Sequence, residues 1–342
     1  MLKNISILLS GIVLISACDD GKAPVHENAL KPTVVTEQVT HDTDDPAIWI
    51  NAADTLESLI IGTDKDTDGA LYAFDLDGKI VNKVPGLKRP NNVDIAYGLL
   101  LNGVRTDVAV VTEREMNRIH VFSLPDLKAI DNGGIDVFTG ETERDPMGVA
   151  LYTRPADSAI FAIVGRKSGP LENYLWQYRL EDDGTGAVKG TLVRKFGKYS
   201  GKKEIEAIAV DNGLGYIYYS DETVGVRKYI ADPDRQDNTE LAHFGTTGFT
   251  SDHEGISIYP LSDSTGYILV SNQQNNTFMV YPREGQPVLL AEIPVSTIES
   301  DGSEVTAVPL GGKFPQGLFV AMSNGKVFHY YSWKDIAERI KP

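Results

Sequence analysis

Three short sequence patterns each recur six times along this chain, at intervals of roughly fifty residues, and a period of that length is typical of propellers and other repeat folds. The most regular pattern is an apolar run that ends in an aromatic residue. Its six copies are Leu71–Phe74, Ile119–Phe122, Leu175–Tyr178, Val226–Tyr229, Phe278–Tyr281 and Val327–Tyr330. The count predicts six structural units of one kind.

Two other patterns precede each aromatic run. The nearer one is an apolar run that stops at a polar cluster, with copies at Leu59–Thr63, Val108–Thr112, Ile160–Val164, Ile217–Ser220, Ile268–Ser271 and Leu318–Met322. The farther one is a further strand pattern, with copies at Asp45–Ile50, Asn92–Tyr97, Met147–Tyr152, Glu206–Asp211, Glu254–Tyr259 and Glu304–Leu310. With the outer strand that follows the aromatic run, each unit holds four strands. We therefore predict an all-β fold, a six-bladed β-propeller with four-stranded antiparallel blades.

The last unit of this ring has no fourth strand of its own, because Trp333–Ile340 has a helical pattern. We expect Thr33–Val39 to supply the missing strand, so that an N-terminal strand closes the ring and covers the exposed sheet edge. The period continues through the chain without a change in composition. Residues 33–342 are therefore predicted to form one propeller domain.

The first residues have the pattern of an export signal. Lys3 is followed by an apolar run, Ile5–Ile15, which is too short to span a bilayer as a mature helix. The segment Leu14–Cys18 is similar to a bacterial lipoprotein signal, so we expect residues 1–17 to be removed and Cys18 to be lipidated; the alternative is an ordinary secretory signal with a chance cysteine. Residues 18–32 would form a flexible tether. The protein would then be exported and lipid-anchored to a bacterial membrane, on the periplasmic or cell-surface side.

The charge of the chain limits its partners. It has 48 Asp and Glu residues against 32 Lys and Arg residues, a formal net charge of −16. Such a surface argues against binding to nucleic acid. An anionic substrate would need a bound cation or a concentrated basic patch to overcome the repulsion. We expect a monomer that contacts the membrane only through its lipid anchor.

Propeller topology brings charged residues from all six units to one face, because the start of each first strand and the end of each second strand lie at the same end of an antiparallel pair. Carboxylates come to this face from all six units, among them Asp44, Asp45, Glu206, Glu222, Asp252, Glu254 and Asp301. The cations come from three consecutive units: Lys65, Arg114, Arg166 and Lys167. Oxygen ligands without Cys or clustered His favour Ca²⁺. Carboxylates and cations on one face suit a polyanionic phosphate ester.

Some acidic residues at these positions have a simpler interpretation. Strand ends and turns are rich in Asp and Asn in any β protein, since short polar side chains bond to the nearby backbone. Asp64, Asp66, Glu115 and Asp145 are best interpreted in this way. The prediction of a site depends on the collective arrangement and not on any single residue.

Seven short motifs are similar, in order, to those of a known family. They are Asp44–Trp49, Asn91–Asp94, Thr112–Arg114, Glu206 with Asp221–Glu222, Asp252–Gly255, Ser300–Gly302 and Phe314–Val320. In these motifs the chain resembles the β-propeller phytases, calcium-dependent enzymes that hydrolyse myo-inositol hexakisphosphate (phytate). The motifs extend over nearly the whole predicted domain.

The resemblance implies roles for the matching positions. The active-site calcium ions and their bridging waters would be held by Asp44, Glu206, Glu222, Asp252, Glu254 and Asp301. Substrate phosphates would be contacted by Lys65, Arg114 and Lys167, with Arg166 as an added or substitute cation. A structural calcium site would be formed by Asp45 and the carbonyl of Pro46, supported by Asn92 and Asp94. Several Ca²⁺ ions are the implied cofactors, and phytate or a related inositol polyphosphate is the implied substrate.

The chain departs from the family pattern at several positions. Asp66 follows Lys65 where a second lysine is common, and Met147 stands where tyrosine is common. The loop before Asp301 is shortened, and Met322–Asn324 lacks the usual acidic residue. We therefore expect fewer bound calcium ions, or weaker retention, than in a typical member.

The predicted reaction is that of a 3-phytase, metal-assisted hydrolysis of a phosphate monoester by an activated water. We see no nucleophile motif for a covalent phospho-enzyme, and we expect His253 to pack within its blade. Two alternatives stay open. One is a calcium-dependent lactonase or esterase-type propeller, which does not need three cations on the face. The other is a non-enzymatic surface propeller that binds a partner.

Overall fold

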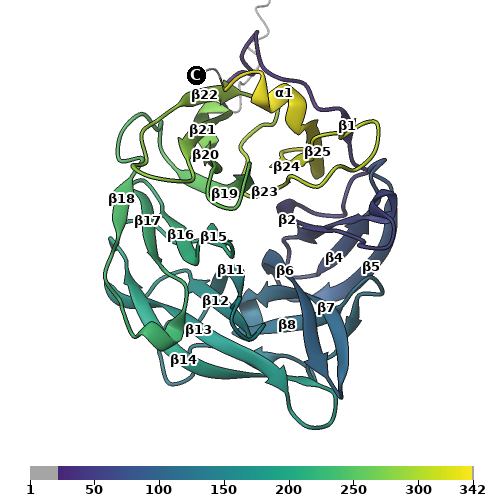
Figure 1. Ribbon diagram of the computed structural model, residues 1–342, viewed down its shortest axis with the longest axis vertical. Coiled ribbons are helices and arrows are strands. Elements are labelled where there is room, and N and C mark those ends of the chain that lie inside the picture. Colours follow the sequence, from purple (N-terminus) through teal and green to yellow (C-terminus); the bar gives the residue numbers. More distant parts are fainter. Residues whose placement is uncertain (1–21, 341–342) are drawn as a thin grey trace, which may run out of the picture.

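The computed structural model describes residues 22–340 and contains six β-sheets arranged around a central axis, as Figure 1 shows. Every pair of named strands is antiparallel. The predicted six-bladed propeller is therefore confirmed. The predicted signal peptide and Cys18 lie outside the described residues.

The first three blades follow the chain in order. Blade 1 contains β2 (Thr43–Trp49), β3 (Leu59–Asp64), β4 (Gly69–Phe74) and β5 (Ile80–Leu87). Blade 2 contains β6 (Pro90–Leu101), β7 (Val104–Glu113), β8 (Arg118–Ser123), β9 (Lys128–Ala129) and β10 (Ile135–Asp136). Blade 3 contains β11 (Pro146–Thr153), β12 (Ile160–Arg166), β13 (Glu172–Asp182) and β14 (Val188–Lys198).

The other three blades complete the ring. Blade 4 contains β15 (Ile208–Asp211), β16 (Tyr216–Asp221), β17 (Gly225–Ile230) and β18 (Ala242–Phe244). Blade 5 contains β19 (His253–Pro260), β20 (Gly266–Asn272), β21 (Thr277–Pro282) and β22 (Ala291–Pro294). Blade 6 contains β23 (Ser303–Thr306), β24 (Leu318–Ser323), β25 (Val327–Ser332) and the N-terminal β1 (Val34–Val35). The helical segments are short: η1 (Thr55–Glu57), η2 (Arg114–Met116), η3 (Pro233–Arg235), η4 (Gln273–Asn275) and α1 (Trp333–Ala337).

The outer edge of blade 2 differs from the predicted four-strand pattern. Two short strands, β9 and β10, pair with β8 in place of one continuous strand. Asp131 lies between them, and its carboxylate accepts the backbone N–H of Val121 at 2.7 Å. The same carboxylate lies 2.9 Å from Nδ1 of His120. The Asp131 carboxylate thus accepts a hydrogen bond that a main-chain carbonyl of a continuous fourth strand would accept, and the outer strand is interrupted at this residue.

An N-terminal strand closes the ring, as predicted. In β1, Val34 pairs with Tyr330 of β25, and β25 also pairs with β24, so β1 is the fourth strand of blade 6. The amides of Thr33, Thr36 and Val39 donate to carbonyls of blade 6 at distances of 2.7–3.0 Å. The contact therefore covers the whole predicted segment, although only two residues have regular strand pairing.

The segment before this strand lies against blade 5. Leu30 forms a parallel bridge with Val295, and the ring of His26 lies 2.9 Å from the carbonyl oxygen of Asn275. Residues 22–32 are the described part of the segment predicted to be a flexible tether. These contacts attach it to the propeller, and its sequence, which has no periodicity, did not predict the attachment. Within residues 22–340, no helix has the length and apolar character needed to cross a membrane.

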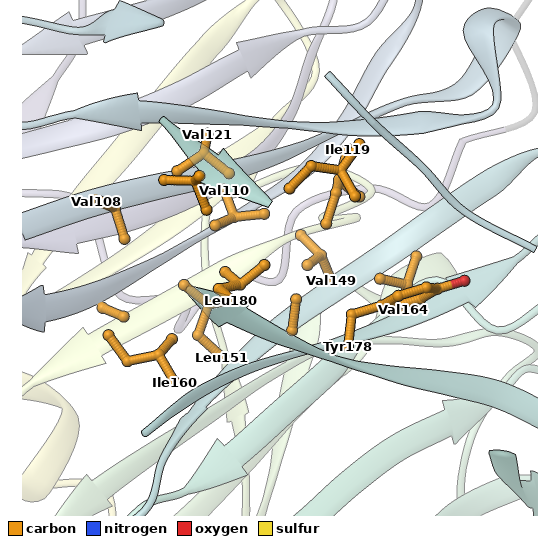
Figure 2. Close-up of a cluster of buried hydrophobic side chains, with 14 of the residues drawn as sticks. Val108, Val110, Ile119, Val121, Val149, Leu151, Ile160, Val164, Tyr178 and Leu180 are labelled. Atoms are coloured by element: carbon orange, nitrogen blue, oxygen red, sulfur yellow. The ribbon is translucent and has the colours of Figure 1, made fainter. Parts of the chain in front are cut away.

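The core consists of apolar layers between adjacent blades. Figure 2 shows the layer between blades 2 and 3, in which Val108 and Val110 of β7 share one buried cluster with Val149 and Leu151 of β11. Because both faces of the inner strands are buried, their sequences are nearly continuous apolar runs. Full burial of one such side chain contributes about 1.5–3 kcal/mol. These layers fix the positions of the blades and so of the strand ends around the axis.

Candidate metal and anion site

The innermost strand of four blades contains a β-bulge at the same place, where the strand approaches the central channel. The pairing register shifts between Thr43 and Pro46, Pro90 and Val93, Pro146 and Val149, and His253 and Ile256. The residues inside these shifts are Asp44–Asp45, Asn91–Asn92, Met147–Gly148 and Glu254–Gly255. A bulge bends the strand and changes the direction of its side chains. This explains how two consecutive residues, Asp44 and Asp45, both reach the axis of the ring.

Hydroxyl groups fasten these segments to the preceding blade. Each comes from the end of a second strand and donates to a main-chain carbonyl of the next blade. The four bonds run from Thr63 to Asn91, Thr112 to Met147, Ser220 to Glu254 and Ser271 to Ser300, with lengths of 2.6, 2.7, 3.2 and 2.8 Å. They lie directly beside the predicted ligands and set the distance between neighbouring blades there.

A first group of predicted site residues surrounds Lys65. Its ammonium forms an ion pair with Asp44 and lies 3.2 Å from Oδ2 of Asp301. The side-chain amide of Asn91 donates to Asp44 at 3.0 Å and also to Glu206. Burial raises the pKa of Asp44 well above its usual range, against the opposing charge of Lys65. Burial likewise raises the pKa of Asp301 to about 6.

A second group of predicted residues contains more carboxylates than cations. One oxygen each from Glu222, Asp252 and Glu254 lies within 4.8 Å of the others, and Glu204, Glu206 and Glu222 meet the same criterion. Glu222 therefore belongs to both sets. Burial raises the pKa of Glu222 to about 8, opposed by Lys203, and raises the pKa of Glu254 well above its usual range.

This second group fits a hard divalent cation. Glu222 Oε1 and Glu254 Oε2 are buried and have no hydrogen-bond partner within residues 22–340. Buried polar atoms are almost always bonded, so unbonded oxygens on two carboxylates of one set call for a cation. The candidate ligands are all oxygens, which suits ions such as Ca²⁺ and Mg²⁺ more than softer metals. The two sets can thus hold a metal ion.

The cations of the face differ in how they are held. The side chain of Lys167 is 44% exposed, and its ammonium lies 2.8 Å from Oε2 of Glu204, a member of the second group. Arg114 begins the short helix η2, directly after β7, and its amide donates to the carbonyl of Arg89 at 3.1 Å. Within residues 22–340, the Arg114 guanidinium forms no ion pair and no hydrogen bond. It is therefore available to an anion.

Arg166 lies at the predicted strand end, the last residue of β12, but its side chain is not exposed on the face. Its side chain is completely buried, its guanidinium lies over the ring of Phe138 at 4.7 Å, and it donates to the carbonyl of Glu143 at 3.0 Å. Because the side chain is enclosed beneath the face, it cannot contact a substrate phosphate without unpacking its aromatic neighbours. We assign Arg166 a packing role.

A cavity of about 150 Å³ is lined by residues from the innermost strands of all six blades. Its polar lining includes Asp45, Pro46, Asn92, Asp94 and Glu304. Asp45 accepts the amide of Val93 at 3.0 Å, and burial raises its pKa well above the usual range. Burial also raises the pKa of Asp94 to about 6. The structure thus brings together all four residues of the predicted structural calcium site, and it adds Glu304.

His253 lies in the blade packing. Its Nε2 is 2.6 Å from the carbonyl oxygen of Gly245, and its ring stacks on Phe249 with centroids 3.7 Å apart. Burial lowers the pKa of His253. A neutral, stacked imidazole in this position does not serve as an acid toward a substrate on the face.

Sequence reasoning assigned no role to the residues that hold the carboxylates in place. The ammonium of Lys203 lies 2.9 Å from Glu222 and 2.6 Å from Asp252. The side-chain amide of Gln274 donates to Asp252 at 2.7 Å, and that of Gln273 donates to Asp301. The two glutamines follow the end of β20, the kind of position that supplied the other candidates. Lys203 lies in a loop ahead of its strand and had no such signal.

The comparisons with known proteins agree with this geometry. A family model described as Phytase matches residues 4–340. The chain is 31% identical over 320 residues to the 3-phytase of Bacillus subtilis (strain 168), covering 87% of this chain and 81% of that protein. Among solved structures, it is similar to a luciferin-regenerating enzyme (TM-score 0.54, 14% identity, 87% of this chain and 95% of that one). It is also similar to the WD40 β-propeller domain of Doa1 (TM-score 0.53, 9% identity, 88% and 96%).

The two solved structures, at such low identity, show the propeller fold alone. The family match extends over nearly the whole chain, and it includes every strand that contributes to the two carboxylate groups. The chain belongs to the phytase family.

Proposed function

We propose that this protein hydrolyses phytate to lower inositol phosphates and phosphate, with Ca²⁺ as its metal. The observation that carries the proposal is the joined pair of carboxylate sets that share Glu222, with Lys65, Arg114 and Lys167 on the same face. A lactonase or esterase-type site has no need of these cations, whereas a substrate with many phosphates does. The family supports a phosphoric monoester hydrolase.

The carboxylates would hold the metal. Glu206, Glu222, Asp252 and Glu254 are the nearest candidates, with Asp44 and Asp301 on the other side of Lys65. When bound, Ca²⁺ would offset the charge of a phosphate and lower the pKa of a water molecule for attack on phosphorus. The bulges and hydroxyl bonds keep these carboxylates together before any substrate arrives.

The cations would bind and orient the substrate. Lys65 is held between Asp44 and Asp301, so its ammonium is a fixed point charge beside the carboxylates. Arg114 offers a planar guanidinium that can bind a phosphate through two parallel hydrogen bonds. Lys167 would hold a further phosphate of the same substrate at the rim. Together they would bind several phosphates of one substrate next to the carboxylates that hold the metal.

The test is phosphate release from phytate by the purified protein. We expect release at about 1 mM Ca²⁺, loss of release with a chelator, and recovery when Ca²⁺ is restored. Calcium should also raise the melting temperature, since it binds the folded state. No release at this concentration would contradict the proposal. Hydrolysis of lactones in its place would favour the lactonase alternative, and neither activity nor stabilisation by Ca²⁺ would favour a non-enzymatic surface protein.

We also propose that the protein is exported and attached to a bacterial membrane through a lipid on Cys18, for which the support is the sequence pattern of residues 1–18. A Cys18→Ser variant should then move from the membrane fraction to the soluble fraction of the host. Phytase activity per molecule should stay unchanged. An unaltered membrane fraction in the variant would contradict this assignment.

A further inference from the structure

We propose that Lys203 is a displaceable cation of this site: its ammonium competes with the divalent metal for Glu222 and Asp252, and after displacement it contacts a phosphate of the substrate. The inference rests on the proposed function and deepens it. It gives a role to a residue that neither the strand-end pattern nor the motifs of the chain had singled out.

The first support is the position of the Lys203 ammonium. It lies 2.9 Å from Glu222 Oε2 and 2.6 Å from Asp252 Oδ2, and both residues belong to the same three-carboxylate set as Glu254. An ammonium and a divalent cation bound to the same oxygens would repel each other strongly across a few ångströms. Occupation by one therefore disfavours the other.

The second support is the difference in enclosure between the two lysines of the site. The side chain of Lys65 is 17% exposed, and that of Lys203 is 43% exposed, although each bridges two buried or largely buried carboxylates. Lys203 thus reaches the carboxylates from the solvent side. Its long flexible stem can swing the ammonium away without unpacking the core.

The third support is the way the backbone of Lys203 is held. The hydroxyl of Tyr199 donates to the carbonyl of Lys203, and the amide of Glu222 donates to the carbonyl of Glu204 at 3.2 Å. The loop is therefore fixed to the rim while the side chain is not. A displaced ammonium would stay at the edge of the face, where an anionic substrate must pass.

The fourth support is the supply of cations. The Arg166 side chain is completely buried, so the face has one cation fewer for a polyphosphate than the sequence predicted. Lys203 would restore one. Its ammonium lies at the second carboxylate group, whereas Lys65 lies at the first.

The experiment compares Lys203→Met with Lys202→Met. Lys202 is the exposed neighbour, and within residues 22–340 its side chain forms no ion pair with a carboxylate. Calcium affinity is measured by calorimetry without substrate, and KM for phytate is measured at saturating Ca²⁺. For Lys203→Met we expect calcium to bind about threefold more tightly or better, because a competing charge is gone. We expect KM to rise about tenfold, because a phosphate contact is lost. Lys202→Met should resemble the wild type in both.

The proposal predicts tighter calcium binding together with a higher KM for phytate. A purely structural role of Lys203 would instead weaken the binding of both calcium and phytate. Weaker or unchanged calcium binding in Lys203→Met would overturn the competition, and an unchanged KM would overturn the phosphate contact. If the wild type released no phosphate at all, the proposed function and the phosphate contact would both fall, while calorimetry would still decide the competition for Glu222 and Asp252.

A second measurement needs no variant. The wild-type protein is treated with an acetylating reagent, with and without Ca²⁺, and the modification of each lysine is followed by peptide mass spectrometry. We expect Ca²⁺ to increase the acetylation rate of Lys203 and leave that of Lys202 unchanged. A rate for Lys203 that stays constant or falls would overturn the displacement.

Discussion

A Glu222→Gln variant is expected to release phosphate from phytate at least about a hundredfold more slowly than the wild type, because it removes a charge that both carboxylate sets share. The rise in melting temperature caused by Ca²⁺ should shrink in parallel, since a metal bound through Glu222 loses an ionised ligand. Phosphate release and thermal unfolding with and without Ca²⁺ measure the two effects.

The same substitution should not destabilise the protein in the presence of a chelator. Burial raises the pKa of Glu222 to about 8, which favours its neutral form in the metal-free protein, and glutamine resembles that form. A carboxyl with a raised pKa also makes the metal-free protein less stable as pH rises from about 4.5 to 8, because the folded state binds more protons than the unfolded state there. Glu222→Gln should weaken this pH dependence.

Glu115→Gln is the matched control, since Glu115 lies exposed in η2 and bonds only to Thr67 among its side-chain contacts. It should keep wild-type activity and calcium response. An equal loss in both variants, or full activity in Glu222→Gln, would mean that the metal is held elsewhere.

A Gly148→Ala variant is expected to lose about 3 kcal/mol of unfolding free energy or more, since overpacking of a tight core costs on this scale. A Cβ atom on Gly148 would lie 1.8 Å from the carbonyl oxygen of Glu206, and backbone cannot move aside as a flexible side chain can. The clash would push blade 4 away from blade 3 and shift Glu206. Urea unfolding and phosphate release would report the two consequences.

Gly312→Ala provides the comparison, because Gly312 has open space around its Cβ position and no left-handed backbone conformation. It should unfold at nearly the wild-type urea concentration. If Gly148→Ala were as stable and active as Gly312→Ala, then the close approach of blades 3 and 4 would not set the position of Glu206.

The architecture followed from sequence alone, and so did the choice of strand ends that meet on one face. Six aromatic runs at a nearly constant interval require six similar units, and the absence of an outer strand after Val327–Tyr330 implied the ring closure that β1 provides. Strand order then placed residues such as Asp44 and Glu222 on one face, because antiparallel pairing decides which strand ends meet.

The remaining features depend on contacts that no local pattern contains. A bulge adds one residue to a strand without changing its composition, so the separate directions of Asp44 and Asp45 could not be predicted. Arg166 and Lys167 are adjacent in sequence, and only the packing of Phe138 decides that one is buried and the other exposed. Lys203 lies in the loop between blades 3 and 4, and only its long side chain brings its charge to Glu222 and Asp252.

The hydroxyl bonds between blades have a consequence for how this enzyme can lose or gain function. Candidate ligands come from blades 1, 4, 5 and 6, and each hydroxyl bond ties one blade to the next at that level. The spacing of the ligands is therefore a property of the closed ring. Glu204, Glu206 and Glu222 all come from blade 4, but the complete set of ligands needs four blades, and disorder in one blade would change the ligand distances in the others.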